Sequence, residues 1–273
     1  METFYAVLLF LSLIYVTSCQ ENFSPRSLPR PLLVDLHKKL SISEDVVFHC
    51  TSWRFAIPKE CKDYVDDYMN KKGYKSDLER VSKEARLYAS TVELKGDGKD
   101  IWVFHVDETL LSNLPYYACS PWLWHEPFFG PTLVWQPPDQ ILIPGLEVFD
   151  DVAFDKWVDK GKAKAIKSSL KLYEELVKLG FKVFLLTGRT ERRRNITTDN
   201  LTKSGFHGWE KLILRGTEDH GKPATQFKSE KRGQMVAEGY RIHGNSGDQW
   251  SDLLGSPVSV RSFKLPNPMY YIA

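Results

Sequence analysis

The sequence carries almost no excess of charge of either sign, since 37 Lys and Arg residues stand against 35 Asp and Glu residues and the formal net charge is +2. Proteins whose main task is to bind nucleic acid usually present a basic excess, so this balance argues against a nucleic-acid partner. After about residue 19 the sequence also lacks any apolar run long enough to span a bilayer. We therefore expect no membrane association once the N-terminal segment has been removed.

Cysteine is scarce, because the chain has only four: Cys19, Cys50, Cys61 and Cys119. No second close pair exists to complete a tetrahedral site, which argues against metal binding by these residues. Cys50 and Cys61 flank a short loop that contains Trp and Pro, and they could pair as a disulfide in an oxidising compartment. Cys119 would then be left over.

The first residues have the pattern of a secretory signal peptide, which we assign to residues 1–19. An apolar stretch over residues 4–16 is followed by small residues, and it is too short to cross a membrane. The alternative interpretation is a buried N-terminal helix. A signal peptide predicts a secreted or vacuolar protein, and on that route Asn195 and Asn200, each within an Asn-X-Thr sequon, are predicted glycosylation sites.

Residues 20–98 are predicted to form a helical N-terminal region. A short helix is expected over 61–70. A second helix is expected to begin at a capping box, Ser76 to Glu79, in which a hydroxyl and a carboxylate satisfy opposite backbone donors. Apolar residues then follow at helical spacing and are expected to face the core: Leu78, Val81, Ala85 and Tyr88.

Residues 99–273 show a regular alternation of short apolar runs and amphipathic stretches. This alternation predicts an α/β fold in which a doubly wound parallel sheet is joined by right-handed crossovers. Gly180 is expected to end one of the helices as a left-handed cap. The expected strands are 101–106, 181–186, 211–214 and 240–243, and the expected helices are 163–179, 192–203 and 228–238.

The segment 119–144 does not fit this alternation. It is rich in Trp, Phe and Pro and almost free of charge, and no helical or strand period would bury its aromatic residues in order. It is either an irregular insertion or a lid or exposed hydrophobic binding surface. A further hypothesis is that it derives from a retained intron or a splice variant, which peptides from this segment in the purified natural protein would exclude.

Polar residues follow the predicted strands where the strands end. Asp107 with Thr109, Thr187, and Asp248 with Asp252 lie just beyond three strands, and the ends of parallel strands converge on one crevice. Carboxylates there can hold Mg²⁺, while a hydroxyl and the ammonium of Lys228 can bind phosphate oxygens. The ordered set predicts a site for phosphoryl chemistry.

Four motifs carry a family resemblance: His-Val-Asp-Glu-Thr at 105–109, Leu-Leu-Thr-Gly-Arg at 185–189, Phe-Lys-Ser-Glu-Lys-Arg at 227–232 and Gly-Asn-Ser-Gly-Asp-Gln-Trp-Ser-Asp at 244–252. They resemble the motifs of the plant acid phosphatases and vegetative storage proteins, a class B-like group of the haloacid dehalogenase superfamily. The resemblance covers most of the chain after about Leu33. It implies a Rossmann-like core with a small cap-like insertion, Mg²⁺-dependent hydrolysis of small phosphomonoesters at acidic pH, and a homodimer.

The resemblance also implies roles for the matching residues. Asp107 would be the general acid/base and would offer its backbone carbonyl to Mg²⁺. Thr187 would hydrogen-bond the phosphoryl oxygens, and Lys228 would neutralise them. Asp248 would ligate the metal directly, and Asp252 would support the metal or its waters.

His105 departs from the family pattern, because active members have the nucleophilic Asp at this position and some storage members lack it. The missing carboxylate would both attack phosphorus and ligate Mg²⁺, and imidazole is a poor ligand for this cation. We therefore interpret His105 as a residue tolerated at a strand end, in a weak or inactive phosphatase that serves as a storage protein. The alternatives are an active Mg²⁺-dependent acid phosphomonoesterase, with residual turnover or with His105 as nucleophile, and a phosphate-binding module without chemistry.

Overall fold

The computed structural model describes residues 61–117 and 151–272. The predicted signal peptide, Cys50 and the segment 119–144 lie outside the described residues. Cys61 is buried and disulfide-bonded, and every other cysteine of the chain also lies outside the described residues. Within residues 61–117 and 151–272, no helix has the length and apolar character needed to cross a membrane.

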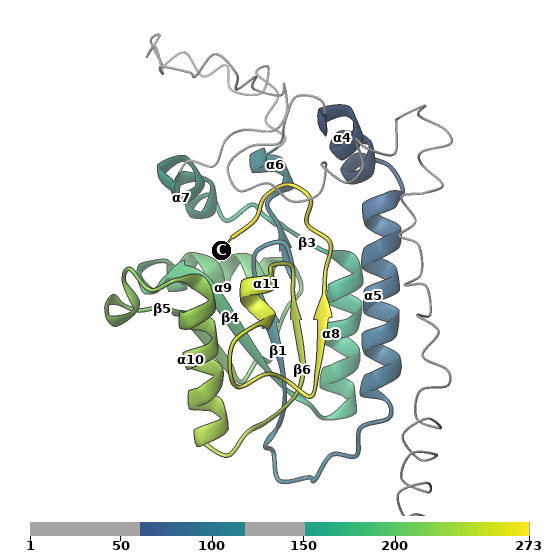
Figure 1. Ribbon diagram of the computed structural model, residues 1–273, viewed down its shortest axis with the longest axis vertical. Coiled ribbons are helices and arrows are strands. Elements are labelled where there is room, and N and C mark those ends of the chain that lie inside the picture. Colours follow the sequence, from purple (N-terminus) through teal and green to yellow (C-terminus); the bar gives the residue numbers. More distant parts are fainter. Residues whose placement is uncertain (1–60, 118–150, 273) are drawn as a thin grey trace, which may run out of the picture. The chain divides into compact units, whose positions relative to one another are not determined.

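The described core is built on a parallel five-stranded sheet with the order β5-β4-β1-β6-β7 (Figure 1). The chain starts at the centre with β1, moves outward through β4 and β5, and then returns to the other side of β1. This is a doubly wound topology, and it confirms the predicted fold class. The strands are β1 (Asp100–His105), β4 (Lys182–Thr190), β5 (Lys211–Arg215), β6 (Arg241–Gly247) and β7 (Arg261–Lys264).

Helices cover both faces of the sheet (Figure 1). One face is packed by α5 (Gly73–Ala89), α8 (Lys167–Leu179) and α9 (Arg194–Lys203), and the other by α10 (Ala224–Ala237) and the short α11 (Trp250–Leu253). Smaller elements complete the described chain: α4 (Lys62–Asn70), α6 (Leu114–Tyr117), α7 (Asp151–Asp159), the 3-10 turns η3 (Glu191–Arg193) and η4 (Thr217–Asp219), and the antiparallel pair β2 (Leu111–Ser112) and β3 (Lys164–Ala165).

Side chains of β1 alternate between two hydrophobic clusters, as the period of a strand requires. Trp102 and Phe104 lie in the cluster beneath α5 and α8, while Ile101 and Val103 lie in the cluster beneath α10. All six residues of β1 are buried, which is typical of a central parallel strand. By the same alternation His105, the last residue of the strand, is directed to the α10 side.

The Trp102 ring is the largest fully buried side chain of this core. It stacks on Phe263 of β7, with ring centroids 5.2 Å apart, and donates a hydrogen bond from Nε1 to Ser246 Oγ at 3.0 Å. Gly244 of β6 leaves room for the indole, since a Cβ at this position would lie 2.4 Å from the Trp102 ring. One aromatic side chain thus joins β6 and β7 to β1.

At the opposite end of β1, the buried Asp100 joins three elements. Its carboxylate accepts hydrogen bonds from Arg241 Nε at 2.7 Å and from the Lys95 backbone N–H at 2.7 Å, and it lies 2.7 Å from His243 Nε2. The hydrogen bonds from Arg241, His243 and the Lys95 N–H hold the pKa of Asp100 well below its ordinary value, although burial acts in the opposite direction. This cluster fixes the end of the sheet away from the crevice.

The predicted elements agree with the structure in type more closely than in bounds. All four predicted strands form, and Gly180 ends α8 with φ of 98° as expected. The capping box at Ser76 is wrong, because α5 begins at Gly73 and the Ser76 N–H donates to Lys72 O within the helix. The helix expected from residue 163 begins at Lys167, since the residues before it pair with β2.

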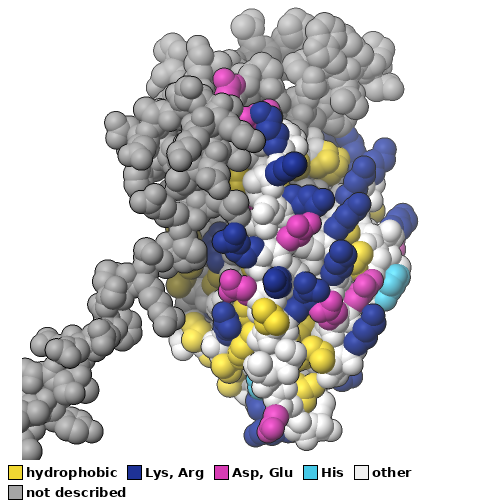
Figure 2. Space-filling view, turned by 90° about the vertical axis from the view of Figure 1, so that its right-hand side faces the viewer, with side chains coloured by type: hydrophobic (Ala, Val, Ile, Leu, Met, Phe, Trp, Pro, Cys, Tyr) yellow, Lys and Arg dark blue, Asp and Glu magenta, His cyan; other side chains and the backbone are white. Residues whose placement is uncertain are grey.

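The outer face formed by α5 and α8 is rich in Lys and Arg (Figure 2). Exposed Lys75 and Lys83 of α5 and Lys167 and Lys171 of α8 contribute to it. The small net charge of the chain therefore conceals an uneven distribution of its basic residues.

Candidate active site

The C-terminal edge of the sheet carries a cavity of about 600 Å³. His105 and five residues of the predicted phosphoryl site line it: Asp107, Thr187, Lys228, Asp248 and Asp252. Thr109 does not line the cavity, but its hydroxyl donates to Asp248. The strands β1, β4 and β6 end here, and α10 supplies Lys228 from its second turn. The structure thus brings together residues that are up to 147 positions apart in sequence (252 − 105), as the convergence of parallel strand ends predicts.

His105 is 3 % exposed and faces Asp252. Nδ1 of the imidazole lies 3.2 Å from Asp252 Oδ1, but without hydrogen-bond geometry, and neither ring nitrogen has a hydrogen-bond partner within the described parts of the chain. Burial lowers the pKa of His105 to about 3, because the loss of hydration outweighs the attraction of Asp252, and Lys228 and Arg232 act in the same direction as burial. The imidazole is therefore neutral near pH 5.

Asp252 is held by Lys228 rather than by His105. The Lys228 ammonium donates to Asp252 Oδ1 in a close buried ion pair, and the Gln249 backbone N–H donates to Oδ2 at 2.9 Å. Burial raises the pKa of Asp252, but His105, Lys228 and the Gln249 N–H together hold it below its ordinary value. Asp252 therefore carries the charge that keeps Lys228 in place.

Asp107 forms a salt bridge with Arg189. The guanidinium donates from Nη2 to Oδ1 at 2.7 Å and from Nε to both carboxylate oxygens at 3.1 and 3.2 Å. Asn113 Nδ2 and Thr187 Oγ1 donate to the same carboxylate at 2.9 and 3.3 Å. Burial raises the pKa of Asp107, but Arg189, Asn113 and Thr187 outweigh it and hold the pKa below its ordinary value.

Asp248 is surrounded by neutral donors. Its carboxylate accepts from Thr109 Oγ1 at 3.1 Å, Gln249 Nε2 at 2.7 Å and Asn267 Nδ2 at 2.9 Å. Burial and the nearby charge of Asp252 raise the pKa of Asp248 to about 6. A large part of the population is therefore protonated at acidic pH.

Several residues of the site were not singled out from the sequence: Glu108, Asn113, Arg189, Asn267 and Tyr270. Glu108 is fully buried with a positive φ of 48°, and it accepts hydrogen bonds from Tyr270 and from the Asn113 backbone N–H at 2.7 Å. Burial, followed by the charges of Asp248 and Asp107, raises the pKa of Glu108 to about 8. The available signals were the position of Arg189 directly after Thr187-Gly188 and the polar residues near the C-terminus.

The two predicted glycosylation sites differ in accessibility. Asn195 is exposed at the start of α9. Asn200 is 3 % exposed, and its Nδ2 donates to Ala163 O at 2.7 Å, so a glycan on this nitrogen would break the contact that joins α9 to the segment before β3. The structure thus leaves Asn195 accessible and argues against modification of Asn200.

A doubly wound parallel sheet with Asp, Thr, Lys and Asp side chains at its C-terminal edge defines a protein of the haloacid dehalogenase class. The model of one family of this class, "HAD superfamily, subfamily IIIB (Acid phosphatase)", matches residues 38–273, and the chain belongs to this family. The family resemblance seen in the sequence motifs is therefore confirmed.

Comparison with known proteins gives the same family. The chain is 53 % identical to Acid phosphatase 1 of Solanum lycopersicum over 277 residues, which covers 97 % of this chain and 99 % of the relative. It is 34 % identical to Vegetative storage protein 2 of Arabidopsis thaliana over 86 % of this chain and 83 % of the relative. The class C acid phosphatase of Bacillus anthracis has the same fold, with a TM-score of 0.57 and 19 % identity over 77 % of this chain and 85 % of that one.

Acid phosphatases of this superfamily typically use a divalent metal, but the side chains present here do not fit Mg²⁺. The carboxylate of Asp107 is engaged by Arg189, that of Asp252 by Lys228, and that of Asp248 by three neutral donors. His105 offers a nitrogen where Mg²⁺ prefers oxygen. Within the parts of the chain that the structure describes, no group of three His, Cys, Asp or Glu side chains is arranged to hold a metal ion.

Proposed function

We propose that the chain is an acid phosphatase-like protein of the secretory pathway, secreted or vacuolar, that hydrolyses phosphomonoesters weakly or not at all. Its role would be that of a vegetative storage protein, and its ligand a small phosphomonoester or phosphate. Relatives named acid phosphatase and vegetative storage protein support the two halves of this proposal. The family resemblance further suggests a homodimer. Light scattering on the protein as it elutes from a size-exclusion column measures the molar mass and tests this.

The state of His105 is the observation that carries the proposal. The residue stands where the nucleophilic carboxylate is expected, and it is a buried, neutral imidazole to which no side chain of residues 61–117 and 151–272 is hydrogen-bonded as an orienting base. A nucleophile needs an adjacent group that activates and positions it. Loss of the covalent nucleophile commonly lowers the rate by about 10⁴-fold or more, and positioning and electrostatics supply the residual activity.

Binding of phosphate without chemistry is the second candidate function. Thr187, Arg189 and Lys228 still line the cavity, and each can donate to a phosphoryl oxygen. At present Arg189 and Lys228 are neutralised by Asp107 and Asp252, so an anion must compete with these carboxylates. Moderate affinity for phosphate, without turnover, is what this arrangement supports.

Hydrolysis of a generic phosphomonoester near pH 5 with Mg²⁺ tests the proposal, with the natural protein compared with its His105→Asp variant. We expect turnover in the variant alone, which would mean that the scaffold is intact and the nucleophile is what is missing. Asp248→Asn in the variant background is the control and should abolish the activity. If the natural protein matches the variant, and both lose activity on Asp248→Asn, the chain is an active phosphomonoesterase and the proposal is wrong.

A further inference from the structure

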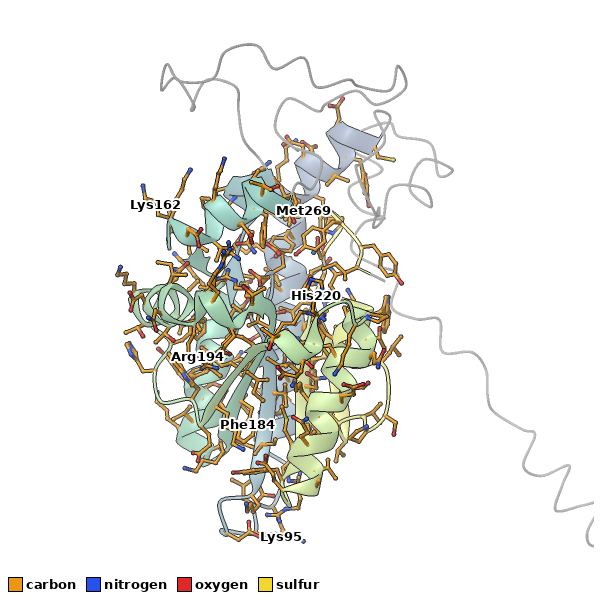
Figure 3. All side chains as sticks on the ribbon, turned by 90° about the vertical axis from the view of Figure 1, so that its left-hand side faces the viewer. Lys95, Lys162, Phe184, Arg194, His220 and Met269 are labelled. Atoms are coloured by element: carbon orange, nitrogen blue, oxygen red, sulfur yellow. The ribbon has the colours of Figure 1, made fainter. Side chains whose placement is uncertain are left out.

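The cavity is larger than one phosphate group requires. Its volume of about 600 Å³ lies within the range that holds drug-sized ligands. The phosphate site proposed above occupies the inner part, near the ends of β1 and β6. The lining continues to the end of β5 and the start of α10, where Arg215, His220 and Ala224 face the same space (Figure 3, in which His220 is labelled).

Arg215, the last residue of β5, is held by main-chain groups on one side only. Its Nη1 donates to Asp219 O at 2.7 Å and to Lys222 O at 2.9 Å, and the guanidinium carbon lies 4.4 Å from the centre of the Phe227 ring. Within residues 61–117 and 151–272, no hydrogen bond or ion pair engages its Nε or Nη2. These donors are therefore fixed in place and available to a ligand.

The positive charge of Arg215 at the outer end of the cavity differs from the two positive charges at the inner end in having no direct ion-pair partner among the described residues. Lys228 has Asp252 and Arg189 has Asp107 as a direct ion-pair partner. Asp219 is the carboxylate that acts electrostatically on Arg215. Its side chain, however, forms ion pairs with Lys222 at 3.0 Å and with Lys231 at 2.9 Å. Among the described residues, Arg215 thus has no carboxylate as a direct ion-pair partner at the wall of the cavity.

We propose that the cavity binds phosphomonoesters that carry a second phosphoryl group, with Arg215 and His220 as the outer phosphate site. This inference rests on the proposed function, since the first phosphoryl group occupies the inner site near Lys228 and Thr187. Arg215 binds the second group through Nε and Nη2, the fork geometry that suits phosphate oxygens. The first turn of α10 adds backbone N–H groups, beginning at Ala224, which lines the cavity, and no side chain in the described part of the chain caps them.

Calorimetric titration of the full chain with orthophosphate and with inorganic diphosphate, in buffer with EDTA, tests this inference. We expect diphosphate to bind at least about tenfold more tightly than orthophosphate, which is the worth of one charge-assisted contact. Arg215→Gln should remove about tenfold of the diphosphate affinity and leave the orthophosphate affinity within about twofold. Arg215→Lys should restore part of the loss.

Two further variants guard against a trivial result. Arg215→Gln also removes the hydrogen bonds from Arg215 to main-chain oxygens. His220→Ala therefore serves as a second variant: it replaces an exposed side chain and should independently lower diphosphate affinity by about threefold. Lys211→Gln, on the same strand but outside the cavity, should have no effect. Equal affinity for the two anions, equal losses for both in Arg215→Gln, or no binding of either would overturn the inference.

Turnover separates this inference from the proposed function. If the natural protein hydrolyses phosphomonoesters but still prefers diphosphate through Arg215, the proposed function fails and the outer site stands. If the protein is inert and binds orthophosphate without preference for diphosphate, the proposed function stands and the outer site fails.

Discussion

The protonation state of His105 makes the stability of the protein depend on pH in a way that its replacement should remove. Burial lowers the pKa of His105 to about 3 in the folded chain, whereas the unfolded chain has an ordinary imidazole with a pKa near 6.5. Between these two values the unfolded state binds one more proton than the folded state, so stability falls as the pH falls. The effect begins below about pH 6.5.

The magnitude follows from the difference between the two pKa values. A pH of 5 lies about 1.5 units below the pKa of the imidazole in the unfolded chain, and each unit corresponds to about 1.4 kcal/mol. Titration of His105 therefore lowers the free energy of unfolding of the natural protein by about 2 kcal/mol between pH 7 and pH 5. His105→Gln removes the titrating group but keeps a neutral polar side chain. The substitution itself changes the free energy of unfolding by the same amount at both pH values, so this change cancels when the two pH values are compared.

Urea unfolding of both proteins at pH 7 and pH 5 measures this difference. We expect the natural protein to lose about 2 kcal/mol more than His105→Gln between the two pH values. His207→Gln, at an exposed position outside the cavity, is the matched control substitution. If His105 and Asp252 formed a charged pair, acidification would instead stabilise the natural protein relative to the variant, and that result would refute the neutral imidazole.

Three other predictions concern packing, the sheet end and the metal. Gly244→Ala should lower the free energy of unfolding by about 1–3 kcal/mol, because its Cβ would meet the Trp102 ring, whereas Gly188→Ala, whose Cβ meets no atom within 4 Å, should change it by less than about 0.5 kcal/mol in urea unfolding. Asp100→Ala should lower the free energy of unfolding by about 1–2 kcal/mol in the same assay, because the buried carboxylate accepts hydrogen bonds from Arg241 and the Lys95 N–H and contacts His243; no measurable change would contradict the assigned role. Calorimetry should find Mg²⁺ affinity at least about tenfold higher in His105→Asp than in the natural protein, since the variant restores an oxygen ligand; equal affinities would contradict the fit argument.

The sequence was sufficient for the fold because its strands are marked by apolar runs that end in polar turns. The four strands expected from these runs all form, and the convergence of their ends correctly placed Asp107, Thr187 and Asp248 in one cavity. The edge strand β7 was missed, because only Phe263 of its four residues is fully buried and the segment shows little period. Helix starts were the least accurate feature, as the capping box at Ser76 illustrates, since helical hydrogen bonding begins earlier at Gly73.

The pairing of charges within the site could not be predicted from the sequence. Lys228, which was expected to meet phosphate, directs its ammonium to Asp252 instead, and Arg189, to which the sequence assigned no role, directs its guanidinium to Asp107. Which partner each cation takes depends on how the packing of the whole sheet positions the side chains at the strand ends. The burial of Asn200 likewise depends on a contact with Ala163, 37 residues away, which a sequon does not reveal.

Trapping of a phosphoryl-enzyme tests most directly whether His105 has replaced a nucleophile without taking over its function. The natural protein and His105→Asp are incubated with a radiolabelled phosphomonoester and Mg²⁺ near pH 5, and the bound label is then tested for stability to hydroxylamine, acid and base. We expect a hydroxylamine-labile acyl phosphate in the variant and no covalent label in the natural protein. An acid-labile, base-stable label in the natural protein that disappears in His105→Gln would identify a phosphohistidine and contradict the account.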